Sequence, residues 1–120
     1  MSAARLVVSR HVTPDGVSVL KLAGEIDFNT AVGFREALAD RDGAPGHRTV
    51  VDFREVTFMD SSGINVLVAA NRAAGEGGGW VRLSSLPTAV HDVLRIVGLD
   101  EVLCLYPTLD HALESPAPPS

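Results

Sequence analysis

Hydrophobic and polar positions along the chain alternate between short apolar runs and longer segments with helical spacing. The short runs are rich in β-branched residues and predict strands over residues 6–9, 17–23, 49–53, 80–83 and 102–106. Between the first two lies Thr13-Pro14-Asp15-Gly16. Proline fixes one turn dihedral and glycine accepts a positive φ, so this segment predicts a β-hairpin.

Segments with helical spacing follow the later strands. A first helix is indicated by apolar residues three or four positions apart, namely Ala31, Phe34, Ala37 and Leu38. Asp27 or Asn29 can cap its start. A second helix is expected over residues 61–74, stopped by the glycines that follow. A third should begin at Pro87, with Ser85 near its cap, and residues 107–114 should form a short last helix.

This order of elements predicts the fold class. Two strands and a helix are followed by strands and helices in alternation, which is typical of an α/β domain with a small mixed, mostly parallel sheet. The 120 residues fit a single domain. We expect the domain to span residues 1–114, and we expect the proline-rich segment 115–120 to be a disordered tail.

Charge and composition restrict the classes of partner. The formal net charge is -5, Lys21 is the single lysine, and the arginines are scattered. Without a basic stripe, neither a nucleic-acid surface nor a membrane-binding patch is expected. No signal peptide is evident, and the nearly apolar run 63–70 is too short to cross a bilayer, so we expect a cytoplasmic protein. Cys104 lies between apolar residues and is expected to be a buried thiol.

The start of the second predicted helix carries the clearest candidate chemistry, in the sequence Asp60-Ser61-Ser62-Gly63. The first amides of a helix lack internal partners, and the helix dipole is positive there. A phosphate on Ser61 or Ser62 would meet a ready-made anion site. Serine and aspartate are also the commonest N-caps, so spacing alone favours a simple cap, and both roles can coexist.

The same helix is expected to present a weakly charged face of mostly small side chains to solvent. Its inner arc should face the sheet and contains Gly63, Val66, Leu67, Ala70 and Ala74. Its outer arc contains Asn65, Ala69 and Arg72, with Ser62 toward the edge and Val68 on the shoulder. A small, weakly charged face suits docking, although an ordinary solvent-exposed face explains it nearly as well.

Catalytic and metal-binding patterns are weak. Ser61 does not lie in the Gly-x-Ser-x-Gly pattern of serine hydrolases. The four histidines have neither a pairing pattern nor metal-ligand spacing, so no enzyme is expected. Asp52 and Asp60 flank one loop and leave a nucleotide- or Mg²⁺-binding domain as a weaker hypothesis. The basic partner that a phosphoaspartate site needs, Lys21, is distant in sequence.

Two segments resemble the signatures of STAS domains. They are Leu22-Ala23-Gly24-Glu25-Ile26-Asp27, followed by Thr30-Ala31, and Val56-Thr57-Phe58-Met59-Asp60-Ser61-Ser62-Gly63. More narrowly, they are similar to bacterial anti-sigma factor antagonists, and the likeness extends from the first strand to Tyr106. The resemblance implies a STAS-like sheet covered mainly on one side by about four helices.

The resemblance also implies a function. The unmodified antagonist binds an anti-sigma factor that is also a serine kinase, and the sigma factor is released. The kinase uses its own ATP and Mg²⁺ to phosphorylate the serine after the aspartate, here Ser61, and a serine phosphatase reverses the step. The chain itself then needs no cofactor and is expected to be a monomer when free. Whether Ser62 is modified instead stays open.

The partner surface expected from the resemblance and the helical wheel combines the loop after the second strand with the second helix. Its residues are Asp27, Asn29, Thr30, Asp60, Ser62, Gly63, Asn65, Val68, Ala69 and Arg72. Asn65 lies where relatives often carry a small or apolar residue, and it is a candidate for tuning partner choice. The alternative within the family is an unphosphorylated scaffold subunit of a lipid-transport ATPase complex.

Overall fold

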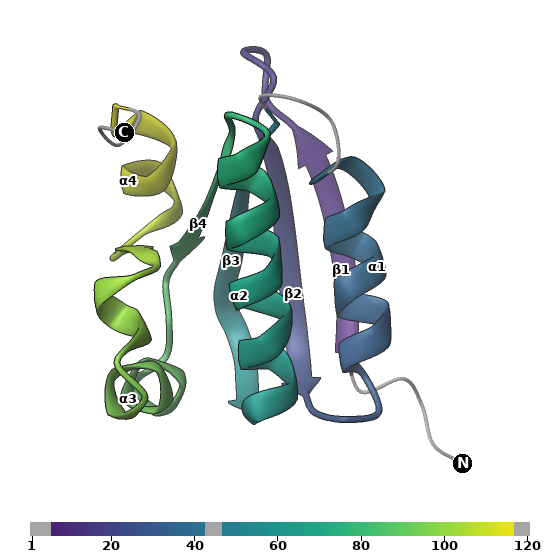
Figure 1. Cartoon of the computed structure of the whole chain (residues 1–120), viewed down its shortest axis with the longest axis vertical. Helices are drawn as coiled ribbons and strands as arrows, with labels where there is room; N and C mark the ends of the chain where they lie inside the picture. The colour runs from purple at the N-terminus through teal and green to yellow at the C-terminus, as the bar shows by residue number, and fades with distance from the viewer. Residues whose placement is uncertain (1–5, 43–46, 117–120) are drawn as a thin grey trace.

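Five strands form one sheet in the order of the chain, β1-β2-β3-β4-β5, with β1 antiparallel to β2 and the other neighbours parallel (Figure 1). The computed structural model describes residues 6–42 and 47–116. The strands are β1 (Leu6–Val12), β2 (Ser18–Ile26), β3 (Arg48–Met59), β4 (Trp80–Ser84) and β5 (Cys104–Tyr106). The helices are α1 (Ala31–Asp42), α2 (Ser61–Glu76), α3 (Thr88–Ile96), the 3-10 turn η1 (Leu99–Glu101) and α4 (Leu109–Glu114). The STAS-like α/β architecture predicted from the sequence is confirmed.

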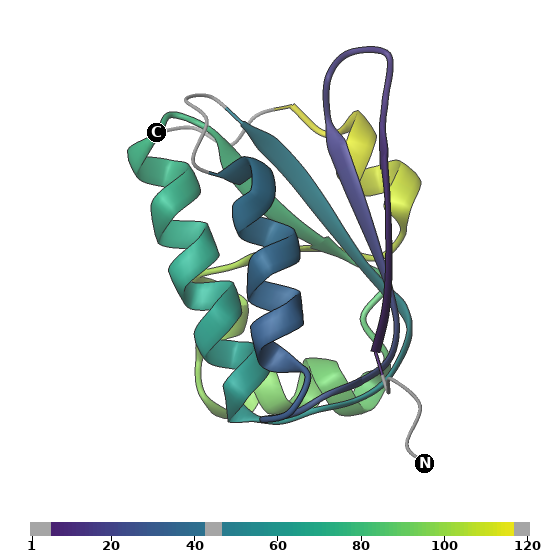
Figure 2. The ribbon, with the colours of Figure 1, turned by 90° about the vertical axis from the view of Figure 1, so that its right-hand side faces the viewer.

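The helices cover the two faces of the sheet unequally. Both α1 and α2 pack against one face, and α4 lies against the other (Figure 2). The main core lies under α1 and α2 and includes Leu20, Phe34, Val51, Phe53 and Leu67. A smaller core under α4 is formed by Val17, Val50 and Ala112, with Trp80, Tyr106, Leu109 and Leu113 packed against it. The two faces of the sheet therefore pack against different elements: one against the long helices α1 and α2, and the other against α4 near the carboxyl end.

The predicted hairpin turn is present. The amide of Thr13 donates to the carbonyl of Val17 at 2.9 Å, and Gly16 has a φ of +90°. The Thr13 hydroxyl donates to the Asp15 carboxylate at 2.6 Å, and this hydrogen bond is the main reason that the pKa of Asp15 lies below its usual value.

Two central strands are longer than the sequence predicts. β2 continues to Ile26 and β3 continues to Met59, whereas we expected ends at residues 23 and 53. The extra residues pair in parallel, with Gly24 opposite Val56 and Ile26 opposite Met59. Register shifts interrupt the regular alternation of buried and exposed positions along this stretch. The hydrophobic pattern of the sequence therefore did not predict the carboxyl-terminal parts of these two strands. β1 is also longer, since its pairing with β2 extends to Val12.

Several expected boundaries in the second half were wrong by a few residues. Pro87 is the N-cap of α3 rather than its first residue. Ser85 lies two residues before this cap, with a φ of +58°. α4 begins at Leu109, after a cap in which Thr108 accepts from the amide of His111. Cys104 is half-buried rather than buried.

A buried arginine holds the carboxyl end of the domain. Arg82 is 1% exposed and points from β4 toward α4. Its guanidinium donates to the carbonyls of Ala112, Ser115 and Pro116 and lies over the ring of Trp80 at 3.8 Å. Arg82 therefore ties the carbonyls of Ser115 and Pro116, the first two residues of the expected tail, to β4. The rest of the predicted tail, 117–120, lies outside the described residues.

Within the described ranges, none of the helices has the length and apolar character needed to cross a membrane.

Candidate functional site

Asp60 caps α2 and occupies the anion position at the helix start. Its side-chain oxygen Oδ1 accepts a hydrogen bond from the amide of Ser62 at 2.8 Å. Its backbone carbonyl accepts from the amides of Gly63 and Ile64 at 3.1 and 3.3 Å. Three amides of the first turn, those of Ser62, Gly63 and Ile64, are thus already bonded to Asp60. The cap is Asp60, and neither serine provides it.

Ser61 is left exposed by this arrangement. It is the first residue of α2, and its hydroxyl makes no hydrogen bond to any of the described residues. Ser62 is half-buried, and its amide is held by the Asp60 cap. Because Ser61 is exposed, a phosphate on its hydroxyl would add its charge at the surface of the domain.

The loop between β2 and α1 is fixed by its own hydrogen bonds. Asp27 accepts from the amides of Asn29 and Thr30 through Oδ1, at 2.9 and 3.1 Å. The Thr30 hydroxyl accepts from the amide of Asp27 and donates to the carbonyl of Glu25, both at 2.9 Å. Asp27 therefore caps the turn into α1, and the alternative cap, Asn29, is exposed. The loop is a preformed turn.

This loop and the start of α2 form one continuous platform. The amide of Asp60 donates to the carbonyl of Ile26 at 3.1 Å, which joins the two segments directly. Gly63 brings them close, because a Cβ atom at this position would lie 2.7 Å from Ile26 Cγ2 and from Met59 Cγ. Gly63 is buried, so the structure gives it a packing position beneath the predicted partner surface rather than on it.

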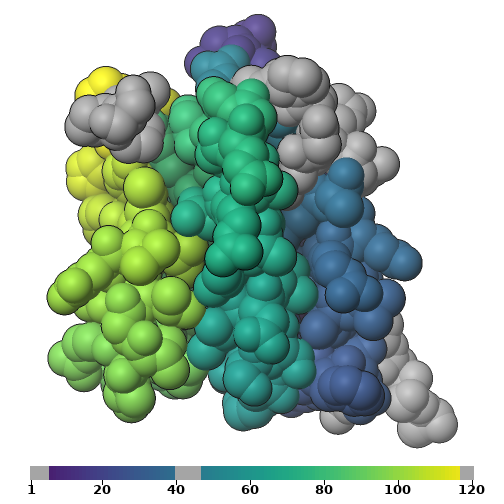
Figure 3. Space-filling view, viewed as in Figure 1, coloured from purple at the N-terminus to yellow at the C-terminus, as the bar shows by residue number. Residues whose placement is uncertain are grey.

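The rest of α2 has the predicted faces. All five residues of the predicted inner arc are buried, and Ile64 joins them. Asn65, Ala69 and Arg72 are exposed, and Val68 is half-buried against the main core. In the space-filling view, α2 runs through the middle of one broad face, between α1 and the segment that contains α3 and η1 (Figure 3).

Two apolar residues near this platform were missed by sequence reasoning. Phe28 is 81% exposed and Val32 is 50% exposed, and both line a groove with Ser62, Asn65 and Ala69. The available signal was an aromatic residue between the polar residues Asp27 and Asn29 of a loop, a position where burial in the domain is not expected.

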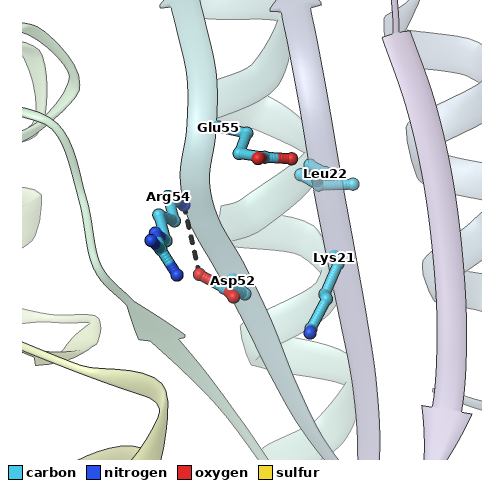
Figure 4. A pocket seen from close by; sticks show the side chains of 5 residues that line it. All are labelled: Lys21, Leu22, Asp52, Arg54 and Glu55. Carbon is cyan, nitrogen blue, oxygen red and sulfur yellow. Dashed lines mark hydrogen bonds between the residues drawn. The ribbon is translucent and has the colours of Figure 1, made fainter.

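Asp52 belongs to a different part of the molecule. It lines a polar pocket with Lys21, Leu22, Arg54 and Glu55, and its Oδ1 accepts from the Arg54 amide at 3.1 Å (Figure 4). Lys21 lies opposite Asp52 in the register of β2 and β3, so the structure brings together two residues that are far apart in sequence.

The structure does not bring Asp52 and Asp60 together. Seven residues lie between them, and the eight steps of extended chain span about 26 Å at the rise of a β-strand. Asp52 also faces the α4 side of the sheet, where its neighbours include Thr108 and Asp110. Within residues 6–42 and 47–116 there is no group of three or more acidic, histidine or cysteine side chains placed to hold a metal. The shared Mg²⁺ site considered for these two aspartates is therefore not formed.

Comparisons with known proteins agree with this architecture. A family model described as "Mlab, STAS domain" matches residues 9–107. The anti-sigma-F factor antagonist RsfB of Mycobacterium tuberculosis is 31% identical over 116 residues, which cover 94% of this chain and 92% of RsfB. A solved anti-sigma factor antagonist from Mycobacterium paratuberculosis is 33% identical, with a TM-score of 0.79 over 94% of this chain and 96% of that one.

SpoIIAA, another anti-sigma factor antagonist, shares the fold in an unphosphorylated and in a phosphorylated form. The unphosphorylated form has a TM-score of 0.75 at 19% identity and covers 90% of this chain and 94% of its own. The phosphorylated Bacillus protein has a TM-score of 0.70 at 21% identity and covers 90% and 97%. Together with the family match over residues 9–107, the five-stranded sheet and the capped α2 lead to one conclusion: this chain belongs to the STAS domain family.

Proposed function

We propose that this protein is an anti-sigma factor antagonist whose unphosphorylated form binds an anti-sigma factor with serine kinase activity, and that phosphorylation of Ser61 ends binding. The observation that carries the proposal is the position of Ser61, exposed at the start of α2 with its neighbour Asp60 acting as the cap. The names of the similar mycobacterial proteins support the same function.

The geometry supports a switch that works by charge. Phosphorylation adds roughly -1.5 to -2 charges at neutral pH. Asp27 and Asp60 lie on the platform from which Ser61 projects, so the phosphate would add to negative charge already present. Like charges forced together in an interface cost several kcal/mol, which is enough to release a partner without refolding.

In this proposal, the chain acts by binding and does not catalyse a reaction. The kinase partner supplies ATP and Mg²⁺, and a separate serine phosphatase restores the unmodified form. The partner surface comprises the β2–α1 loop, with Asp27, Asn29 and Thr30, and the exposed residues of α2 around Ser61.

Intact-mass analysis after incubation with ATP and each of a panel of purified anti-sigma factor kinases tests the modification. We expect one added phosphate on wild type and on Ser62→Ala, and none on Ser61→Ala. A phosphate that survives Ser61→Ala and disappears in Ser62→Ala would move the site to Ser62. If no kinase of the panel modifies the wild type, the switch proposal fails.

The second candidate is an unphosphorylated scaffold subunit of a transporter ATPase complex, the alternative that the resemblance to STAS domains leaves open. The matching family model is described by Mlab rather than by an anti-sigma name. A stable complex with a transporter ATPase, formed equally by wild type and Ser61→Asp, would support the scaffold and contradict the switch.

A further inference from the structure

A groove runs between α1 and α2 and begins at the platform that carries Ser61. Its first part, of about 320 Å³, is lined by Phe28, Ala31, Val32, Arg35, Ser62, Asn65, Val66 and Ala69. A second part, of about 180 Å³, is lined by Arg35, Leu38, Ala39, Val66, Ala69, Ala70 and Ala73. The two parts share Arg35, Val66 and Ala69, so they are continuous. The short alanine side chains of α2 leave the groove open.

The mouth of this groove presents apolar surface on a rigid support. Phe28 is 81% exposed, yet the residues on either side of it are fixed by the Asp27 and Thr30 hydrogen bonds. Binding through Phe28 would therefore not require the loop to be ordered first, which removes one of the usual costs of association. Aromatic residues with large exposed area are enriched in the centres of protein interfaces.

Charge indicates what kind of segment fits. Arg35 lines both parts of the groove and forms no ion pair with any residue that the structure describes. A partner side chain that reaches this point is favoured if it carries a carboxylate, which can pair with the guanidinium through two hydrogen bonds. The acidic residues Asp27 and Asp60 lie only toward the Ser61 end.

We propose that this groove, with Phe28 at its mouth, seats an apolar segment of the anti-sigma factor that carries a carboxylate opposite Arg35. This inference rests on the proposed function, since the segment bound in the groove belongs to the same partner that contacts Ser61. It adds a second contact area, on α1, whose contribution to affinity does not depend on phosphorylation.

The test begins with a panel of purified anti-sigma factors, from which the one that binds the wild type is chosen. Each variant is then titrated with that anti-sigma factor, and its affinity is compared with that of the wild type. Phe28→Ala should weaken binding at least about tenfold, as loss of a central aromatic anchor does. Arg35→Gln should weaken it several-fold and reduce the dependence of the affinity on salt. Two matched controls lie on the opposite face of the sheet: Val7→Ala, where the exposed fraction is 61%, and Arg54→Gln. Both controls should bind within about twofold of wild type.

The outcomes separate the groove from the switch. If wild type binds, Ser61→Asp does not, and both groove variants bind like wild type, the groove proposal is wrong and the proposed function stands. If wild type binds no member of the panel, the proposed function fails and the groove proposal fails with it. If Phe28→Ala instead converts a wild-type dimer into a monomer in light scattering, the occupant is a second copy of this chain, which overturns the proposal.

Discussion

At the scale of single residues, Asp60 determines how α2 begins and how Ser61 is presented. Asp60→Ala removes the side-chain acceptor of the Ser62 amide and should lower the free energy of unfolding by about 1 kcal/mol. Urea denaturation measures this loss. Asp60→Asn is the matched control, because asparagine caps helices as well as aspartate does. Equal losses in both variants would show that the charge, and not the cap, stabilises the helix.

Gly63 and Gly75 lie in the same helix and should respond to alanine in opposite ways. At Gly63 a Cβ atom would lie 2.7 Å from Ile26 Cγ2, so Gly63→Ala should destabilise the fold by about 1–3 kcal/mol through overpacking. At Gly75 nothing lies within 4 Å, and alanine should stabilise the helix by up to about 1 kcal/mol. Thermal denaturation of the two variants tests this, and a Gly63→Ala variant as stable as wild type would contradict the close contact.

The hairpin turn offers a prediction about pH. The Thr13 hydroxyl lowers the pKa of Asp15, so this interaction stabilises the folded state above the unfolded pKa of the carboxyl. The stabilisation should be lost as the pH falls through the folded pKa. In an NMR titration, Thr13→Ala should raise the pKa of Asp15 toward its usual value. An unchanged pKa in Thr13→Ala would assign the shift to another group.

At the scale of elements, α4 depends on Arg82. A helix of six residues is not stable alone, and three carbonyls near its end are held by one guanidinium. Arg82→Met keeps the volume but removes these charge-assisted hydrogen bonds, each worth about 1.5–3 kcal/mol. We expect faster hydrogen exchange in α4 and a lower free energy of unfolding. Slow exchange in α4 of the variant would show that the small core alone is sufficient.

The element scale also shows how far the sequence could predict the fold. The order of strands and helices was predicted, because the spacing of apolar residues in a helix or a strand depends only on that segment of the sequence. The carboxyl ends of β2 and β3 were not, since the register shifts there break the alternation. The Asp60 cap was one of several possibilities that local sequence left open. The proximity of Lys21 to Asp52 depends on strand pairing, which no local pattern encodes.

At the scale of the whole molecule, the main prediction is that phosphorylation changes binding without changing the fold. The amides of Ser62, Gly63 and Ile64 are already bonded to Asp60, so we expect a phosphate on Ser61 to leave the start of the helix in place. Amide chemical shifts of the phosphorylated protein should differ from those of the unmodified protein only around residues 25–31 and 60–65. Widespread shifts, including β4 and α4, would indicate a conformational switch instead.

The position of Trp80 has a practical consequence. This single tryptophan is covered by the Arg82 guanidinium and lies in the small core under α4, on the face of the sheet opposite α1 and α2. Its fluorescence should therefore change when α4 detaches from the sheet. It should stay the same when a partner binds on the Ser61 side. In a Trp80→Phe background, Phe28→Trp would give the docking face an optical signal of its own, so that events on the two faces can be followed separately, each in its own single-tryptophan protein.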